Sequence, residues 1–331
     1  MLLVCLAFVG VPCALHAQLT GELGAHDPST VIFDNGRYYY LATGDLLAVR
    51  SSADLTNWTA EPAAFNQVPS WVPGTLPGYG GQSLWAPDII KLGSQYHLYY
   101  SASIFGTKLS GIGHATSPTL DPNAPNYGWT DQGAPVISSN HGSPYNAIDP
   151  SMLLDEDTGR LWMTWGSFNN GIYVKEMNPT TGQPLSASPG VNVAAPGPTP
   201  EIEGAAMVKH DGDYYLFVNW GGCCSGVDST YNVRVGRSSS PTGPFLDRDG
   251  VNLLSGGGTL FLDDDGRKIG PGHFSFTDAG GQEMFSYHYY NGDVLGAPTF
   301  GLRDLYWTAD GWPSLAAVDS NWTGSTSASW S

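Results

Sequence analysis

The sequence predicts an all-β protein folded as a five-bladed β-propeller, and three observations support this prediction. The chain of 331 residues contains 43 glycines and 24 prolines, a density of turn formers that favours many short strands over helices. A similar phrase of about 20 residues occurs five times. The copies begin near residues 27, 86, 149, 203 and 273, and this spacing of 50 to 70 residues suits one four-stranded blade.

Each copy is expected to form two strands joined by a hairpin turn. In chain order the copies are HDPSTVIFDNGRYYYLATG from His26, WAPDIIKLGSQYHLYYSAS from Trp85, AIDPSMLLDEDTGRLWMTWGS from Ala147, IEGAAMVKHDGDYYLFVNWG from Ile202 and PGHFSFTDAGGQEMFSYHYY from Pro271. Their turns read DNG, LGS, DEDTG, HDGD and DAGG, which is the local chemistry of short hairpins. Segments that follow several copies, such as SGIGHATSP and YNVRVGRSSSP, leave room for a third and a fourth strand.

A ring of blades explains the repeated phrase better than a two-sheet sandwich does. A sandwich also has turns at regular intervals, but it gives no reason for one phrase to recur. In a closed ring no long sheet edge is exposed, and the innermost strand of each blade starts near the central axis. Residues at one register of the five copies are therefore expected to converge on the axis.

Three acids and one histidine share the register at the start of the innermost strand. When the copies are aligned on the aromatic residues of their second strands, the residues at or within one position of the same place are Asp27, Asp149, Glu203 and His273. We expect these side chains to meet at one end of the central channel.

Several of these acids also have a plain structural interpretation. Asp27 and Asp149 precede prolines and could form Asx turns, although their recurrence in register argues against this. Glu201 lies outside the register, and we expect it to be a solvated charge. Asp88 comes just after the register position in the second copy, and we expect a structural role for it.

The two ends of the chain differ in composition from the repeats. Residues 1–17 combine an apolar run with Ala17 as a small residue before a cleavage site, which predicts a signal peptide. The propeller is expected over residues 18–319, followed by a Ser/Thr-rich tail over 320–331. No other apolar run is long enough to span a bilayer. We therefore expect a secreted protein, extracellular or periplasmic, without a membrane partner.

The charge of the chain restricts its ligands. Thirty acidic residues against 13 basic ones give a formal net charge of −17, which repels nucleic acids, anionic membranes and polyanionic polysaccharides. Aromatic residues make up 12% of the chain and include 11 tryptophans, and flat rings are surfaces on which sugars stack. A neutral or cationic ligand is expected.

Only two cysteines remain once the predicted signal peptide is removed. Cys223 and Cys224 are adjacent, so they can form either a vicinal disulfide or two free thiols. Adjacent Cα atoms lie about 3.8 Å apart, which is short for a disulfide, but export favours oxidation.

A cluster of acids suits the hydrolysis of a glycosidic bond. The reaction needs one protonated carboxyl group for the leaving oxygen and one ionised carboxylate that attacks or activates water. Close carboxylates push one another's pKa values apart, so a third acid can keep the general acid protonated.

The chain resembles glycoside hydrolase family 43, and most closely its endo-α-1,5-L-arabinanases, in seven ordered motifs. They are HDP at 26–28, WAPD at 85–88, AIDP at 147–150, EIEGA at 201–205, CCSGVDSTYNVRVGRS at 223–238, PGH at 271–273 and DGWP at 310–313. The resemblance implies a five-bladed propeller and an inverting enzyme that cleaves internal bonds of arabinan, a plant cell-wall polysaccharide.

The resemblance also implies a role for each acid. Asp27 would be the general base that activates water, Glu203 the general acid, and Asp149 the acid that tunes and orients Glu203. The two carboxyl groups of an inverting pair are expected roughly 6.5–9.5 Å apart, which leaves room for the water.

Further site residues follow from the resemblance alone. Trp85 and Phe105 look like the family's aromatic platforms, and Asn146 and Ser167 look like its polar sugar contacts. His273 would help to hold one largely hydrated calcium ion in the channel. The partner is then a polysaccharide, and we expect the protein to act as a monomer.

Two other functions stay open at this point. An exo-acting α-L-arabinofuranosidase or a β-xylosidase of the same family would use the same three acids. A propeller that binds carbohydrate without catalysis is the alternative from another class.

Overall fold

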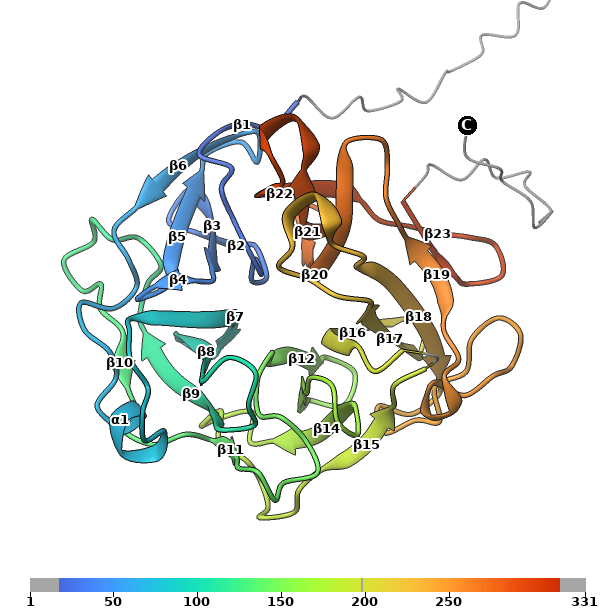
Figure 1. The fold of residues 1–331 in the computed structure, drawn as a ribbon. Helices are drawn as coiled ribbons and strands as arrows, with labels where there is room; N and C mark the ends of the chain where they lie inside the picture. The colour runs from blue at the N-terminus through green and yellow to red at the C-terminus, as the bar shows by residue number, and fades with distance from the viewer. Residues whose placement is uncertain (1–17, 198, 316–331) are drawn as a thin grey trace, which may run out of the picture.

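The computed structural model describes residues 18–197 and 199–315, and its five larger β-sheets are arranged around a central axis (Figure 1). The predicted all-β, five-bladed propeller is thereby confirmed. The predicted signal peptide (1–17) and the tail (320–331) lie outside the described residues, so both stay predictions. Within the described part of the chain, none of the helices has the length or the apolar character needed to cross a bilayer.

The first two blades contain the N-terminal half of the strands. Blade 1 has the order β1-β6-β5-β3-β2 and comprises β1 (Thr20–Gly21), β2 (Ile32–Asp34), β3 (Arg37–Ala42), β5 (Ala48–Ser52) and β6 (Asn57–Glu61). Blade 2 has the order β10-β9-β8-β7-β4, with β11 also on β9, and comprises β4 (Gly44–Asp45), β7 (Ser83–Leu92), β8 (Gln95–Ser103), β9 (Ser110–Ser117), β10 (Thr130–Asp131) and β11 (Ile137–Ser139).

The other three blades follow in sequence order. Blade 3 comprises β12 (Ser151–Asp155), β13 (Arg160–Trp165), β14 (Ile172–Met177) and β15 (Val191–Ala194). Blade 4 comprises β16 (Ile202–His210), β17 (Asp213–Trp220), β18 (Asn232–Ser238) and β19 (Thr259–Leu262). Blade 5 comprises β20 (Lys268–Asp278), β21 (Glu283–Asn291) and β22 (Ala297–Asp304), and a separate pair comprises β23 (Tyr306–Trp307) and β24 (Pro313–Ser314).

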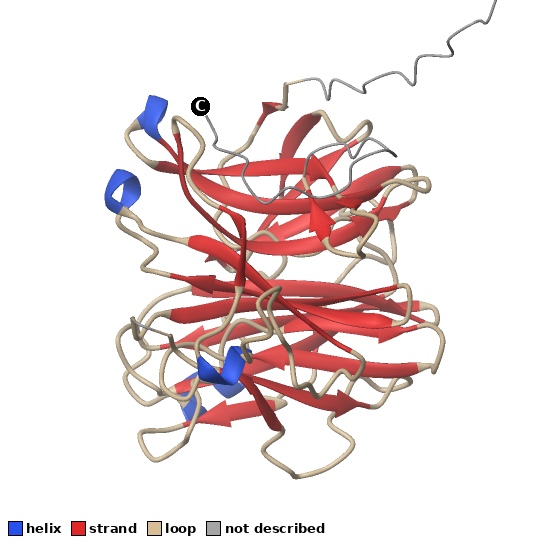
Figure 2. Ribbon diagram, turned by 90° about the vertical axis from the view of Figure 1, so that its right-hand side faces the viewer, coloured by secondary structure: helices blue, strands red, loops and turns tan. Residues whose placement is uncertain are grey.

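Helical structure is confined to short turns in the connecting segments, as the side view in Figure 2 shows. These turns are α1 (Trp71–Thr75), η1 (Gly226–Asp228), η2 (Leu253–Ser255) and η3 (Gly292–Val294). The hairpin turns predicted from Gly and Asp residues are present. In the Asn35-Gly36 and Asp211-Gly212 turns both residues have positive φ, as the type I′ turn that joins twisted strands requires.

A repeat of this length is expected to form four strands, as in blades 3 and 4, but the described sheets of blades 1 and 2 have five and six strands and that of blade 5 has three. The N-terminal segment borders its outer strand instead. Gly24 forms a bridge with Thr299 of β22, and the peptide N–H of Phe300 donates to the carbonyl of Leu23 at 2.8 Å. The N-terminal segment of the described chain thus contacts β22 of the last blade, and this contact closes the ring (Figure 1).

The hydrophobic core is divided into five clusters, one at each junction between neighbouring blades. Side chains alternate across a strand, so β3 directs Tyr39 and Leu41 to blade 2 and Tyr40 and Ala42 to blade 5. Both faces of each blade are therefore covered, which explains why the strands read as nearly continuous apolar and aromatic runs. Trp162, Trp165 and Trp220, among others, are buried as core residues.

The junction between blades 4 and 5 offers a test of this packing. Phe217 is fully buried there, with ring centroids of Phe261 and Phe276 at 4.9 and 4.8 Å. We expect Phe217→Ala to lower the free energy of unfolding by about 3–5 kcal/mol, because it leaves a cavity in a closed ring. Phe33 is 56% exposed. We expect Phe33→Ala to cost less than about 1 kcal/mol in a denaturant titration, and equal losses would contradict this account.

Candidate active site

Each blade has a residue with a left-handed backbone in or shortly before its innermost strand. These residues are Asp27 (φ 52°), Ala86 (φ 43°), Asp149 (φ 60°), Gly204 (φ 55°) and His273 (φ 43°). Residues other than glycine rarely adopt this conformation, although Asp and His tolerate it better than most. Its recurrence in all five blades confirms the register read from the sequence. Glu203 comes one residue before the left-handed position of its blade.

A cleft of about 1120 Å³ lies over this end of the axis and is lined by residues from all five blades. It brings together every residue predicted for the site, namely Asp27, Asp149, Glu203, His273, Trp85, Phe105, Asn146 and Ser167. Trp85 is half-buried and its ring centroid lies 6.5 Å from that of Phe105, whose side chain is 82% exposed. Asn146 is buried, and its Oδ1 accepts the hydroxyl of Ser110 at 2.6 Å.

Asp27 is surrounded by hydrogen-bond donors and histidines. Its Oδ2 accepts the hydroxyl of Thr43 at 2.6 Å and lies 2.8 Å from Nδ1 of His26. Its Oδ1 lies 3.4 Å from Nδ1 of His273 and 3.8 Å from Nδ1 of His288. Burial alone would raise the pKa of this carboxyl, but the charges and the hydrogen bond of the histidines, His26 above all, hold its pKa well below the usual range. Asp27 is therefore ionised.

The histidines around Asp27 are in different states. The charge of Asp27 raises the pKa of His26 above its usual value, against the effect of burial. Burial lowers the pKa of His273 and of His288. The Asp27 peptide N–H donates to Nδ1 of His288 at 3.1 Å, so this ring is neutral and carries its proton on Nε2. Of the three rings, His26 is thus the one whose protonated form this environment favours.

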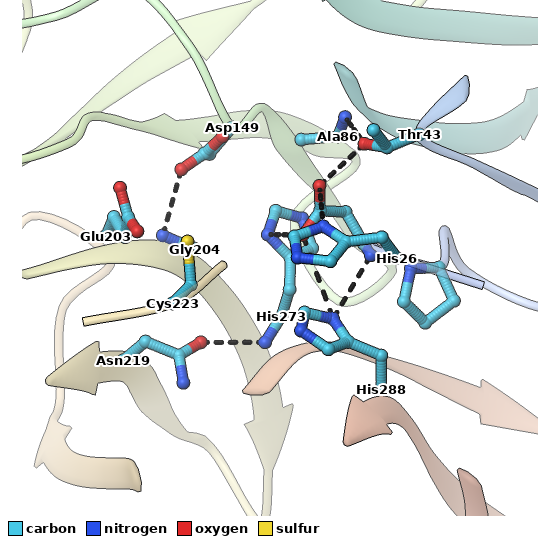
Figure 3. A network of polar contacts seen from close by, with 12 residues as sticks. His26, Thr43, Ala86, Asp149, Glu203, Gly204, Asn219, Cys223, His273 and His288 are labelled. Atoms are coloured by element: carbon cyan, nitrogen blue, oxygen red, sulfur yellow. Dashed lines mark hydrogen bonds and ion pairs between the residues drawn. The ribbon is translucent and has the colours of Figure 1, made fainter. Parts of the chain in front are cut away.

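Asp149 and Glu203 lie together on the side of the site opposite the three histidine rings (Figure 3). Oδ2 of Asp149 accepts the peptide N–H of Gly204 at 3.2 Å, directly beside Glu203. Glu203 Oε2 accepts the hydroxyl of Ser167 at 2.7 Å, and Oε1 accepts the hydroxyl of Tyr231. Ser167 was predicted as a sugar contact, and its hydrogen bond goes to the Glu203 carboxylate.

Both carboxyl groups of this pair hold protons more tightly than a free acid. Burial raises the pKa of Asp149 well above its usual value, and the charges of Glu203 and Asp27 add to the effect. Burial also raises the pKa of Glu203, against the hydrogen bonds from Ser167 and Tyr231. Two buried acids this close share their titration. The site therefore combines an ionised carboxylate, Asp27, with a pair that retains a proton.

Besides Thr43, four residues of the site were not assigned a role from the sequence. His26, His288 and Tyr290 surround Asp27 or its histidines, and Tyr231 holds Glu203. His26 precedes Asp27 in the HDP motif, which is the signal that could have identified it. The other three lie outside the aligned register, and their partners come from a neighbouring blade or strand.

His273 was predicted to hold calcium, and its surroundings limit how it could do so. Calcium takes six to eight oxygen ligands. Among the described residues, the carboxylate oxygen that lies near the His273 ring is Oδ1 of Asp27, at 3.4 Å from Nδ1 of the histidine. The clusters of closely spaced ligand atoms in the described chain, His26-Asp27-His288 and His26-Cys223-Cys224, do not include His273. The donor atoms around His273 therefore fit only a calcium ion that keeps water for most of its ligands.

Cys223 and Cys224 form a vicinal disulfide on the wall of the cleft, which decides between the two states open from the sequence. The peptide N–H of Cys224 donates to the hydroxyl of Tyr290 at 2.7 Å, and its Sγ lies 3.7 Å from Nε2 of His26. Tyr290 also bonds to Nε2 of His26 at 2.8 Å. The disulfide loop thus borders the residues that hold Asp27.

Comparison with known proteins agrees with the fold and the group of acids described above. The family model of the glycosyl hydrolases family 43 matches residues 21–313. The chain belongs to this family. Within family 43, the chain is similar to the extracellular endo-α-(1→5)-L-arabinanase 1 of Bacillus subtilis, with 38% identity over 87% of each chain.

Two further family 43 proteins are similar over most of their length. The extracellular exo-α-(1→5)-L-arabinofuranosidase of Cellvibrio japonicus is 32% identical over 94% of this chain and 91% of its own. The structure of the Cellvibrio cellulosa α-L-arabinanase complexed with arabinohexaose superposes with a TM-score of 0.83 at 33% identity, over 89% of this chain and 96% of that one.

Proposed function

We propose that this protein is an inverting endo-α-1,5-L-arabinanase that hydrolyses internal bonds of arabinan. The observation that carries the proposal is the pairing, within one cleft, of an ionised Asp27 with a carboxyl pair whose pKa values are both raised. Hydrolysis with inversion needs this combination of a base and an acid. The family 43 relatives that act on arabinan give the substrate.

Asp27 would act as the general base. Its low pKa keeps it ionised, and its bonds to Thr43 and His26 fix the carboxylate, so that a water can be oriented toward the sugar. His26 stabilises the negative charge before the proton arrives. The base and the acid are expected roughly 6.5–9.5 Å apart, and this spacing would lead to inversion.

Glu203 would act as the general acid. Its raised pKa keeps a proton available for the leaving oxygen, and the hydroxyl groups of Ser167 and Tyr231 fix its orientation. The charge of Glu203 raises the pKa of Asp149, and two like charges in one buried pair act on each other, so Asp149 would serve as the modulator of the pair. As the proton leaves, the same two hydroxyl groups stabilise the glutamate formed.

The lining of the cleft supports cleavage within a chain. Trp85 and Phe105 of blade 2 stand on one side of the acids, and the Cys223-Cys224 loop of blade 4 stands on another. Aromatic faces suit the neutral sugars that the negative charge of the protein leaves as substrates. The alternative is exo-acting release of arabinose, which the similarity to the Cellvibrio japonicus exo-enzyme favours.

We also propose that the enzyme is secreted and acts as a monomer. Two of its relatives are extracellular, which supports the predicted signal peptide. One chain supplies every residue of the proposed mechanism, which supports a monomer.

Calcium remains part of the proposal through His273, with Asp27 as the nearest carboxylate and water for the remaining ligands. When bound, the cation would supply positive charge that favours the ionised carboxylate beside it.

Substitution of the acids tests the function directly. We expect Glu203→Gln and Asp27→Asn to lower kcat on linear arabinan by about 10²–10⁴-fold or more, because each removes a proton-transfer group. Glu201→Gln, two positions away, is the matched control and should stay within about threefold of the parent protein. Retained turnover in the first two variants would remove these acids from the mechanism, whereas a parent protein that binds arabinan without turnover would point to a non-catalytic propeller.

Product analysis separates the endo and exo alternatives. Debranched linear arabinan should give short oligosaccharides early in the reaction, because the substrate would cross the whole cleft. Chromatography that finds only arabinose from the first time points would favour the exo enzyme.

The pH dependence tests the assignment of the acid. Activity should fall as the pH rises through the pKa of Glu203, because the reaction needs its protonated form. Tyr231→Phe removes a donor to the ionised form, so the pKa should rise and the alkaline limb of kcat/KM should move up by about one pH unit. Tyr214→Phe removes a buried hydroxyl from Asp155 and should leave the limb in place. An unmoved limb in Tyr231→Phe would argue against Glu203 as the acid.

Calcium binding can be measured without activity. After chelation, added Ca²⁺ should raise the Tm of the parent protein and give a heat of binding in calorimetry. His273→Ala should lose both signals, whereas His210→Ala, which changes a histidine stacked on Trp307, should keep them. A calcium response that survives in His273→Ala would remove this residue from the site.

A further inference from the structure

Blade 2 differs from its neighbours in what it contributes near the axis. Blades 1 and 3 carry Asp-Pro-Ser from the left-handed position onward, at residues 27–29 and 149–151. Blade 2 carries Ala-Pro-Asp at residues 86–88, so an alanine has the position of the acid and the acid comes two residues later. This acid, Asp88, belongs to β7 and is only 2% exposed.

The Asp88 carboxylate accepts hydrogen bonds from equivalent positions of three blades. Oδ1 accepts the N–H groups of Thr30 at 3.0 Å and Ile89 at 2.9 Å. Oδ2 accepts the N–H of Met152 at 2.8 Å. Each of these residues comes three positions after the left-handed residue of its blade. At these positions no strand is paired on the axial side, since β4 pairs with β7 only at Ser83 and Leu84, so the buried N–H groups need side-chain partners.

Blade 2 holds the same two segments at a second pair of points. The Asp149 peptide N–H donates to the hydroxyl of Ser101 in β8 at 3.0 Å. The Thr43 hydroxyl, which donates to Asp27, accepts the peptide N–H of Ala86 at 2.8 Å. Blade 2 therefore contacts Asp149 directly, reaches Asp27 through Thr43, and binds both segments again three residues beyond the acid.

We propose that Asp88 is a positioning residue for hydrolysis, which sets the separation between Asp27 and the Asp149–Glu203 pair by fixing the segments that follow Asp27 and Asp149. The inference rests on the proposed function. Its two oxygens face different blades, so the carboxylate acts as a spacer of fixed length between the base and the acid pair. The rate of acid–base catalysis depends steeply on where the acid and the base lie, since a displacement of about 1 Å can lower the rate roughly 10²-fold.

The test is Asp88→Asn in the complete protein. An asparagine keeps the shape but offers one acceptor oxygen, and its NH₂ group would face an N–H donor, so one of the two segments loses its anchor. We expect kcat on linear arabinan to fall about 10- to 100-fold while KM stays within about threefold, because the sugar contacts of the cleft are unchanged. If Asp88→Asn folds poorly, Asp88→Ser is the second variant, since it copies Ser29 and Ser151.

The matched control is Asp155→Asn. Asp155 is equally buried, at 1% exposed, and joins blades 3 and 4 through Lys209 Nζ at 2.7 Å and the hydroxyl of Tyr214 at 2.6 Å. It does not line the cleft. We expect Asp155→Asn to lower the Tm and to leave kcat per folded molecule unchanged. Equal effects of the two substitutions on kcat would reduce Asp88 to a stabilising residue.

A crystal structure of the Asp88 variant gives a readout that needs no activity. The distance between the carboxyl carbons of Asp27 and Asp149 should change by about 0.5 Å or more, which exceeds the tolerance of a catalytic site. An unchanged distance overturns the proposal. If the parent protein fails to hydrolyse both arabinan and aryl arabinofuranosides, the proposed function fails, and the comparison of distances still decides the role of Asp88.

Discussion

The structure depends on how it accommodates buried carboxyl groups around one axis. Asp27, Asp88, Asp149 and Glu203 are all below 9% exposed, and an unpaired charge at such depth would cost several kcal/mol. The cost of burying each carboxyl group is offset in a different way. Asp27 is balanced by His26, Asp88 accepts three peptide N–H groups, and Asp149 and Glu203 retain a proton between them. The proposed division between a base and an acid follows from these different ways of accommodating a carboxyl group.

The repeats made the fold and the positions of the acids predictable. A blade repeats its backbone, so Asp27, Asp149 and His273 stand at the left-handed position of their copies, and Glu203 lies one residue away. Partners across blades do not repeat, which is why His288, Tyr290 and Tyr231 were missed. The four-strand expectation failed in blade 5 because the N-terminal segment borders β22, and no local pattern marks a contact between the two ends of a chain.

The five left-handed residues show how a uniform fold produces a site of mixed composition. The conformation is common to all blades, so the propeller determines where a side chain enters the axis, and the residue type determines what it does there. Blades 1 and 3 present acids and blade 5 presents a histidine, while Ala86 of blade 2 presents a methyl group. Blade 2 has no reactive side chain at this position, and its residues instead hold the neighbouring segments of blades 1 and 3.

The closure of the ring beside Asp27 links catalysis to the order in which the chain is made. Asp27 is among the first residues of the propeller to be synthesised, yet His273 and His288 belong to the last blade. Tyr290, the hydrogen-bond partner of His26, also belongs to the last blade. A nascent chain can complete four blades and still lack the surroundings that lower the pKa of its base. The proposed hydrolysis is therefore a property of the finished, closed ring.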